Sequence, residues 1–305
     1  MKNIIMTGAT GILGTAIITE CIQNNIRVTA VARPSSSRLD RIPKSGKVNV
    51  IKCGLDELNK LPELLPGKHE VFYHLGWADI DKSVRNDAEK QERNIKYTIN
   101  AVEAANRLGC KVFIGAGSQA EYGRYDTAIK EEFETKPGTV YGKAKLEAGK
   151  SAAGLCAKYK IKFVWPRIFS IYGLNDGLNT FIMYCISKLL KKEKPSLTAC
   201  TQIWDYLYCS DAAKALILLA EKGMDGQVYN VASGIGLPLL EYVNIIRNAI
   251  DPRAELGVGD LDQGRKLMNL YADITKIKKH TGFKPMVSFK HGIKETIKWY
   301  KENIK

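Results

Sequence analysis

The chain has 305 residues, 45% of them hydrophobic, which is enough for one large domain or two coupled ones around a sizeable core. No apolar run approaches the roughly 18 residues of a membrane span. A strand pattern that begins two residues after Met1 leaves no room for a signal peptide. The net charge of +14 is spread along the chain without a basic stripe of interleaved aromatics, so we expect a solvated surface and no nucleic-acid partner.

The seven cysteines are widely scattered and form no Cys-x-x-Cys pair, and a reduced, cytoplasmic chain is the simplest explanation. The four histidines have no ligand-like spacing, so we expect no metal site. The positive charge is then best explained as solvated surface that also steers an anionic small molecule.

Short apolar runs rich in β-formers alternate with longer amphipathic segments over the first 170 residues. This alternation predicts a parallel sheet with right-handed crossovers. The strands are almost continuously apolar, as in a sheet that is covered on both faces. Strands are predicted at 3–8, 27–32, 48–53, 70–75, 111–116 and 161–168, with helices beginning near Ile12, Leu58, Asp87 and Val140.

The alternation becomes less regular after about residue 170, which indicates a second, smaller lobe. Ser210 fits the N-cap of a helix that follows a strand-like segment. Further elements are predicted as helices near 178–190, 238–250, 273–280 and 289–302, and as strands at 202–208 and 227–232.

The segment TGATGILG (7–14) places glycines in a Gly-x-x-Gly-x-x-Gly spacing between the first strand and the first helix. Glycine permits a tight turn and close backbone approach to a pyrophosphate, and the helix N-terminus supplies N–H donors. We therefore predict dinucleotide binding, with a plain glycine turn as the alternative. The predicted contacts in this loop are Gly8, Thr10, Gly11, Ile12, Leu13 and Gly14.

These elements together predict an α/β fold, a Rossmann-type doubly wound parallel sheet with a smaller C-terminal substrate lobe. Residues 1–170 and about 201–233 would form the dinucleotide-binding domain, with 202–232 returning to the main sheet. Residues about 171–200 and 234–305 would form the substrate lobe.

The end of the second strand carries arginines where NAD-binding sheets often place an acid for the ribose 2′-hydroxyl. Arg33 and Arg38 can bind a 2′-phosphate bidentately, and Ser36 can add a hydroxyl donor. The segment favours NADP(H), with NAD(H) possible. The alternative is that both arginines are merely solvated.

The segment YGKAK (141–145) opens a predicted helix, and the i,i+4 spacing places Tyr141 and Lys145 on one face. A free tyrosine has a pKa of about 10 and is a poor base at neutral pH. A nearby ammonium favours the phenolate, so we expect Lys145 to lower the pKa of Tyr141. Ser118 follows a strand and can bond the same substrate oxygen. The three would transfer a proton at oxygen while a nicotinamide exchanges hydride at carbon.

The order of these motifs resembles that of extended short-chain dehydrogenases/reductases, most closely the nucleotide-sugar epimerase/dehydratase branch. The motifs are TGATGILG, HLGW (74–77), Asn94, Ser118, Tyr141 with Lys145, and PRIFSIYG (166–173). The resemblance implies a sugar-nucleotide substrate and a homodimer formed through helices near 83–107 and 140–159. It also implies cofactor contacts from Leu75, Gly76, Pro166 and Ile168, although strand termination alone would explain Pro166.

Departures from the family pattern narrow the reaction. Dehydratases of this branch carry Asp-Glu after the catalytic Ser or Thr, where this chain has Gln119 and Ala120. Enzymes similar to GDP-fucose synthase use a Cys at the second of these positions and a His after the later Tyr-Gly segment. This chain has Ala120 at the first of these two places and no histidine in YGLND. Those departures argue against 4,6-dehydration and 3,5-epimerisation. A catalytically dead dinucleotide sensor is also disfavoured, because the Tyr-Lys pair is kept.

Two reactions need only Ser, Tyr, Lys and a nicotinamide. The arginines favour the first, NADPH-dependent reduction of the C4 ketone of a nucleoside-diphosphate 4-keto-6-deoxy sugar, with Tyr141 as proton donor. The sequence resembles ketoreductases of this kind, such as CDP-abequose synthase. The alternative is an NAD-dependent C4-epimerase of a nucleotide sugar.

The resemblance also implies substrate contacts from Trp77, Ser118, Gln119, Asn179 and Arg265. Asn179 matches a family asparagine that contacts the diphosphate, with a helix N-cap as the alternative. Trp204 replaces an expected diphosphate-binding arginine, and Arg265 could supply that charge. Trp77 would wall the pocket or simply pack. Asn94 would organise the active site, with a solvated helix residue as the alternative.

Overall fold

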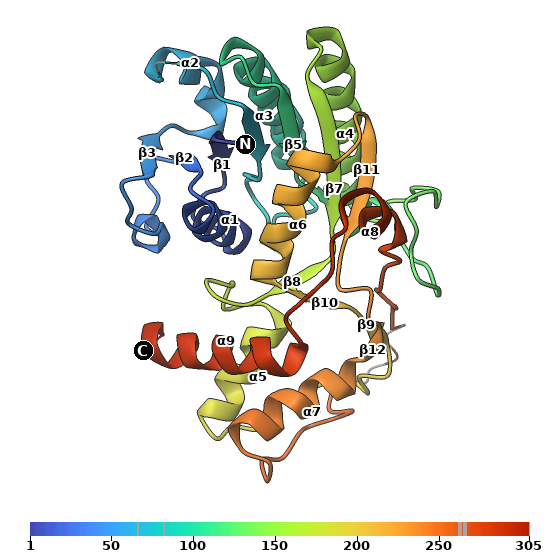
Figure 1. The fold of residues 1–305 in the computed structure, drawn as a ribbon. Helices are drawn as coiled ribbons and strands as arrows, with labels where there is room; N and C mark the ends of the chain where they lie inside the picture. The colour runs from blue at the N-terminus through green and yellow to red at the C-terminus, as the bar shows by residue number, and fades with distance from the viewer. Residues whose placement is uncertain (66, 82, 262–263, 265–266, 305) are drawn as a thin grey trace.

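The computed structural model describes residues 1–65, 67–81, 83–261, 264 and 267–304. A parallel sheet forms the upper part of the molecule and a smaller lobe lies below it (Figure 1). The strand order is β11-β7-β5-β4-β1-β2-β3, which confirms the predicted doubly wound α/β fold. These strands are β1 (Asn3–Thr7), β2 (Arg27–Ala32), β3 (Val48–Lys52), β4 (Val71–His74), β5 (Val112–Gly115), β7 (Lys162–Ile168) and β11 (Gln227–Val231).

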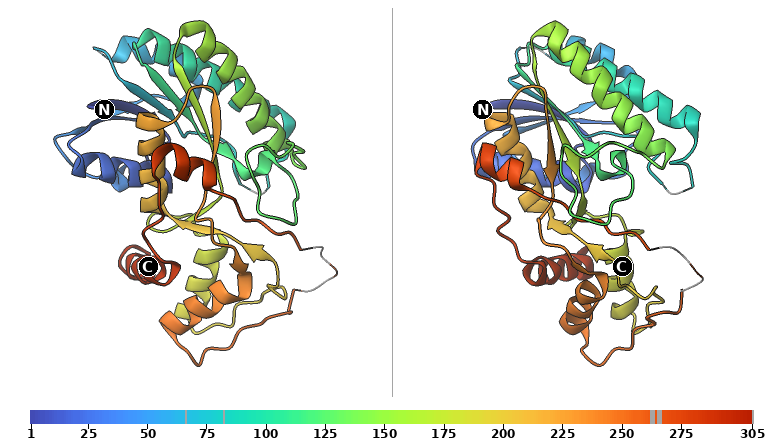
Figure 2. Two further views of the ribbon diagram at one scale, coloured as in Figure 1. Left: turned by 45° about the vertical axis from the view of Figure 1, so that its right-hand side comes forward. Right: turned by 90° about the vertical axis from the view of Figure 1, so that its right-hand side faces the viewer.

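Helices cover both faces of this sheet (Figure 2). Helices α1 (Ile12–Gln23) and α6 (Cys209–Lys222) pack together on one face, and α3 (Ala88–Arg107) and α4 (Val140–Tyr159) pack together on the other. Successive residues of β1 therefore enter different apolar clusters: Ile4 lies with α1 and α6, and Ile5 with α3 and α4. This two-sided burial explains why the strands read as continuous apolar runs.

The sheet order reverses at β1, which lies between β2 and β4. The pairing of β1 with β4 ends at Thr7 and His74. In doubly wound sheets a ligand crevice forms beyond the carboxyl ends of the strands at this switch point. The loops after β1 and β4 are thereby brought together at the site.

The helix expected near Leu58 is shorter than predicted. A 3₁₀ segment, η2 (Leu55–Lys60), is followed by a single turn, α2 (Leu61–Leu64). Pro62 lies at the start of α2 and has no N–H, so it cannot continue a ladder of helical hydrogen bonds from η2.

The smaller lobe has its own apolar cluster among α5 (Phe181–Leu190), α7 (Leu239–Ile250) and α9 (Phe289–Asn303). Two short strand pairs border it: β8 (Ser170–Tyr172) with β10 (Tyr206–Tyr208), and β9 (Ile203–Trp204) with β12 (Leu237–Pro238). Within 202–232, which we expected to return to the main sheet, only β11 joins it. Tyr206 of β10 instead packs edge-on against Tyr172 and Tyr242 in the lobe.

The start of α6 also differs from the prediction. The N-cap is Tyr208, without a side-chain capping bond, and Ser210 lies inside the helix. Helix α8 (Thr275–Thr281), later in the chain, packs against α6 and β11.

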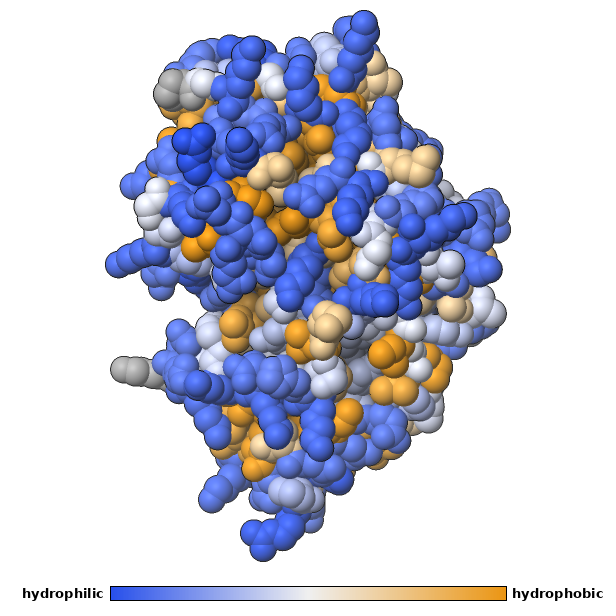
Figure 3. All heavy atoms as spheres, in the orientation of Figure 1, coloured by the Kyte–Doolittle hydropathy of each residue, from blue (hydrophilic) through white to orange (hydrophobic). Residues whose placement is uncertain are grey.

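All seven cysteines are buried, and they divide among the three apolar clusters. The outer face in Figure 3 consists mainly of hydrophilic side chains, in line with the dispersed charge. In the described part of the chain, no helix is long and apolar enough to cross a membrane.

Candidate active site

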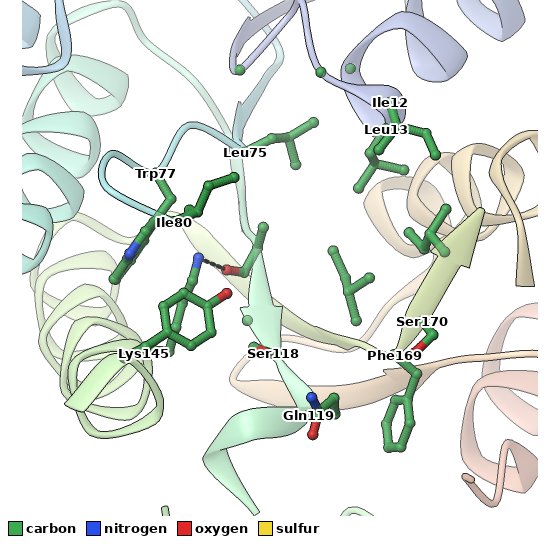
Figure 4. Close-up of a pocket in the computed structure, with 18 residues that line it drawn as sticks. Ile12, Leu13, Leu75, Trp77, Ile80, Ser118, Gln119, Lys145, Phe169 and Ser170 are labelled. Atoms are coloured by element: carbon green, nitrogen blue, oxygen red, sulfur yellow. Dashed lines mark hydrogen bonds between the residues drawn. The ribbon is translucent and has the colours of Figure 1, made fainter. Parts of the chain in front are cut away.

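A cavity of about 350 Å³ opens at the carboxyl ends of β1, β4, β5 and β7, within the size range of small-molecule sites (Figure 4). It brings together most of the predicted residues. Those lining it are Gly8, Gly11, Ile12, Leu13, Gly14, Leu75, Trp77, Ser118, Gln119, Tyr141, Lys145 and Ile168.

The glycine loop is packed too closely for side chains at two of its positions. Gly8 has a φ of +71°, and a Cβ there would lie 2.8 Å from the amide nitrogen of Gly76. A Cβ on Gly14 would lie 2.8 Å from the Cα of Ala9. Gly11 is open by contrast, since its Cβ would meet only the Gly8 carbonyl oxygen at 3.5 Å, and it caps the N-terminus of α1. These features fit the pyrophosphate of a nicotinamide dinucleotide, which when bound would supply a reversible hydride acceptor.

Several predicted cofactor contacts lie outside this cavity lining. Arg33 and Arg38 are exposed in the segment after β2, and the Ser36 Oγ accepts a hydrogen bond from the Arg38 amide at 3.3 Å. The Gly76 amide donates to Thr7 Oγ1 at 3.1 Å and so ties the ends of β1 and β4 together. Thr10 is partly buried and also lies outside the lining.

Pro166 lies within β7 and does not end it. β5 pairs with β7 up to Val164, and β6 (Gly117–Ser118) pairs from Arg167 onward. Pro166 occupies the interval between the two pairings, where a missing N–H is tolerated. Strand termination is therefore the wrong explanation for this residue, and it does not line the cavity.

Ser118 is held in place by a capping box at the start of η3 (Gln119–Glu121). The Ser118 amide donates to Glu121 Oε1 at 2.7 Å, and Ser118 Oγ accepts from the Ala120 amide at 3.2 Å. Arg167 Nε donates to Glu121 Oε2 at 2.7 Å, and both side chains of this ion pair are buried. Glu121 is not among the predicted site residues, although Ser-x-x-Glu is itself a capping signal.

Lys145 is buried beneath the cavity. Its Nζ donates to the Ala116 carbonyl oxygen at 2.7 Å and lies 3.6 Å from the Trp77 ring centroid. Burial lowers the pKa of Lys145 to about 7, although the negative charge of Glu121 acts to raise it. At neutral pH this amine is therefore close to its titration midpoint.

Tyr141 has its pKa raised by burial, while hydrogen bonding to Ser118 and the charge of Arg85 lower it. The expectation that Lys145 lowers this pKa is therefore wrong. The Lys145 ammonium is directed to the Ala116 carbonyl and the Trp77 ring, and it lies 5.9 Å from the Tyr141 ring centroid.

The segment after β4 is fixed by two polar side chains of α3. Trp77 Nε1 donates to Gln91 Oε1 at 2.9 Å, which holds the indole in the cavity wall. Asn94 bonds both backbone groups of Ala78, accepting at 2.8 Å and donating at 3.1 Å. Asn94 is 1% exposed, so a solvated helix residue is the wrong interpretation.

The substrate contacts predicted farther along the chain are not brought into the cavity. Asn179 is exposed, and the neighbouring Thr180 is the N-cap of α5. Arg265 lies outside the described residues. Trp204 Nε1 donates at 2.9 Å to Ser170 Oγ, and Ser170 itself lines the cavity. Other lining residues that the sequence analysis did not assign are Ile80, Ala116, Gly117, Phe169 and Ile171, although Phe169–Ile171 lie in the motif PRIFSIYG.

Among the described residues, no three His, Cys, Asp or Glu side chains gather as a metal site. The fold and site together define a dinucleotide-dependent enzyme with a Ser-Tyr-Lys constellation. The chain belongs to the NAD dependent epimerase/dehydratase family, whose model matches residues 4–232.

A putative UDP-glucose 4-epimerase of Methanocaldococcus jannaschii is 25% identical over 98% of this chain and 99% of its own. A dTDP-glucose 4,6-dehydratase of Neisseria gonorrhoeae is 23% identical over 99% of this chain and 96% of its own. The UDP-N-acetylglucosamine 4-epimerase of Methanobrevibacter ruminantium M1, solved with UDP-N-acetylmuramic acid, superposes with a TM-score of 0.88 at 25% identity and covers 99% of both chains. These relatives confirm the predicted family and give no specific support to the ketoreductase resemblance.

Proposed function

We propose that this chain is a nicotinamide-dependent 4-epimerase of a nucleotide sugar. The observation that carries the proposal is the approach of the Ser118 and Tyr141 side chains in the wall of a cavity that also contains the glycine loop. A hydroxyl pair can bind one substrate oxygen and exchange one proton with it. Tyr141 would take the proton from the C4 hydroxyl and later return it, while Ser118 holds the same oxygen.

The residues after Ser118 support chemistry confined to that carbon. Gln119 lines the cavity and Ala120 follows it, and neither side chain exchanges a proton at neutral pH. Loss of water from the sugar would need a further acid and base at these positions. Epimerisation at C4 needs neither, because the hydride returns to C4 and the proton returns to the oxygen on C4.

The comparisons also favour epimerisation over the ketoreduction that the sequence analysis ranked first. Two of the three proteins named above, the putative UDP-glucose 4-epimerase and the UDP-N-acetylglucosamine 4-epimerase, carry the name of a 4-epimerase and align over almost their full length. A 4-ketosugar reductase remains the second candidate because of Arg33 and Arg38. Both are exposed in the segment after β2, and neither forms an ion pair with another described residue. Free guanidinium groups there favour a 2′-phosphate, and hence NADP(H).

The two functions differ in their consumption of cofactor. An epimerase interconverts the two C4 epimers of a nucleotide hexose with no net change in absorbance at the reduced-nicotinamide band. A reductase oxidises NADPH stoichiometrically when a 4-ketosugar nucleotide is added. Both proposals would be refuted if the protein turned over neither nucleotide hexoses nor 4-ketosugar nucleotides. The substrates tested would include uridine, thymidine, cytidine and guanosine diphosphate sugars.

The cofactor proposal has its own test in the double variant Arg33→Ala/Arg38→Ala. Its dissociation constant for NADP⁺ should rise roughly ten- to hundredfold while that for NAD⁺ changes little, because only the former carries the 2′-phosphate. Calorimetric titration of both dinucleotides measures this. A wild-type protein that prefers NAD⁺, or a variant that loses both dinucleotides equally, contradicts the NADP(H) proposal and removes the argument for the reductase.

A further inference from the structure

Arg85 lies beside Tyr141 and has no counter-charge among the residues that the structure describes. It lies in the segment between β4 and α3, and its Cζ is 4.5 Å from the centroid of the Tyr141 ring, a cation–π geometry. Its Nε is buried and has no hydrogen-bond partner in the described part of the chain. Its guanidinium forms no ion pair with another described residue.

The backbone around Arg85 is anchored at both ends, so the guanidinium is held near Tyr141. The Arg85 amide donates to the Asp81 carbonyl at 2.9 Å. The next residue, Asn86, accepts from the amide of Val140 at 3.3 Å and so joins this segment to the first turn of α4. Asp87 caps α3 through the Lys90 amide.

Two acids of this region, Asp87 and Glu121, are engaged elsewhere. The Asp87 carboxylate accepts from the Lys90 amide at 3.1 Å and lies 3.7 Å from Lys90 Nζ. Glu121, whose charge acts on Tyr141, is paired with Arg167. The N-termini of α3 and α4 add positive dipole ends to the same region. A partly desolvated cation in such surroundings is unfavourable until an anion binds.

We propose that Arg85, beside Tyr141, forms a subsite for a carboxylate attached to C5 of the substrate sugar. The inference rests on the proposed function, because it takes Tyr141 as the group at C4. A C5 substituent is adjacent to C4, whereas the nucleotide diphosphate is attached across the sugar ring at C1. The planar fork of a guanidinium matches a carboxylate with two parallel hydrogen bonds. The preferred substrate class is therefore a nucleotide-linked uronic acid.

Matched nucleotide sugars that differ only at C5 test this subsite. UDP-glucuronate and UDP-glucose, and the corresponding dTDP pair, are titrated calorimetrically into the protein loaded with dinucleotide. The wild-type protein should bind a glucuronate roughly ten- to hundredfold more tightly than the matched glucose, as expected for a charge-assisted contact. Arg85→Met should reduce this ratio to within about twofold, and Arg85→Lys should retain part of it.

Arg93→Met is the matched control, because Arg93 is an exposed arginine on α3 and its loss removes the same charge. The control should keep the wild-type ratio. Equal binding of glucuronate and glucose by the wild-type protein, or a preference that survives in Arg85→Met, overturns the assignment of Arg85 and leaves the proposed function standing. If the wild-type protein binds none of the four compounds and turns over no nucleotide sugar, both proposals are wrong.

Discussion

Tyr141 is the residue on which the proposed chemistry depends most directly. Tyr141→Phe removes the only group proposed to move the proton, while the ring and its contacts with Trp77 and Arg85 can persist. We expect turnover to fall by roughly 10²–10⁴, the usual contribution of general acid–base catalysis. Dinucleotide affinity, measured by calorimetry, should change little. A variant that retains wild-type turnover would exclude Tyr141 as the proton carrier.

Lys145 should leave a signature in the pH dependence of stability. Its folded-state pKa of about 7 lies below the ordinary value of 10.5. At a pH between these two pKa values, Lys145 is protonated in the unfolded chain and has released its proton in the folded chain. The unfolding free energy should therefore rise with pH across this window, by up to about 1.4 kcal/mol per pH unit for one proton.

Lys145→Met isolates this contribution, because other titrating groups act equally in both proteins. Denaturant unfolding at pH 7, 8 and 9 should show the wild type gaining stability relative to the variant as pH increases. A constant difference between the two proteins over this range would mean that Lys145 is not titrating at the depressed value.

Local sequence patterns reveal some site residues and not others. Tyr141 and Lys145 could be predicted because both lie one helical turn apart in one short segment. Arg85 could not, because its significance depends on a contact between the β4–α3 segment and α4. The predicted effect of the Lys145 charge on the pKa of Tyr141 was wrong for the same reason. The spacing places Lys145 on the same helix face as Tyr141, but only the packed structure directs its ammonium toward Ala116 and Trp77.

At the scale of elements, the glycine loop is tightly packed at Gly8 and Gly14 and open at Gly11. Gly14→Ala places a methyl group against the Ala9 backbone, which should cost about 1–3 kcal/mol and weaken dinucleotide binding. Gly46→Ala is the control, since a Cβ there meets nothing within 4 Å, and its stability should be unchanged or slightly higher. Thermal unfolding with and without dinucleotide compares the two. Equal behaviour would argue against the packed-loop explanation.

The ion pair between η3 and β7 positions the Ser118 segment. Glu121→Gln leaves Arg167 buried without its counter-charge, so we expect a loss of about 3–5 kcal/mol in unfolding free energy. Glu134→Gln removes a partner from the exposed pair with Lys136 and should change stability by less than about 0.5 kcal/mol. Urea unfolding of both variants gives the comparison. Similar losses would show that burial does not distinguish these pairs.

Element prediction succeeded where a segment had one dominant pattern. The sheet strands are buried on both faces, so their apolar runs identify them without knowledge of their partners. The segment 202–208 was also predicted as a strand, but its sequence pattern does not specify which strand it pairs with. Its aromatic residues pack into the cluster of the smaller lobe, which sequence periodicity alone does not indicate.

At the scale of the whole molecule, α3 and α4 lie side by side on one outer layer, where the family resemblance implies a homodimer. Tyr97, Ile99 and Leu146 of these helices are partly exposed and belong to none of the three apolar clusters. We expect a particle of twice the 33.9 kDa chain mass in sedimentation experiments. Leu146→Arg should dissociate it, and Met286→Arg, on an exposed side chain elsewhere, should not. A monomeric wild-type protein would contradict the dimer.

The burial of all seven cysteines provides built-in reporters of local opening. Cys21 lies among α1 and α6, Cys156 in the cluster of α3 and α4, and Cys185 in the smaller lobe. A thiol reagent can reach each sulfur only when the surrounding segment opens. Mass-resolved labelling rates would therefore compare the opening of the two sheet faces with that of the lobe, and would reveal which of them a bound dinucleotide or sugar nucleotide holds closed.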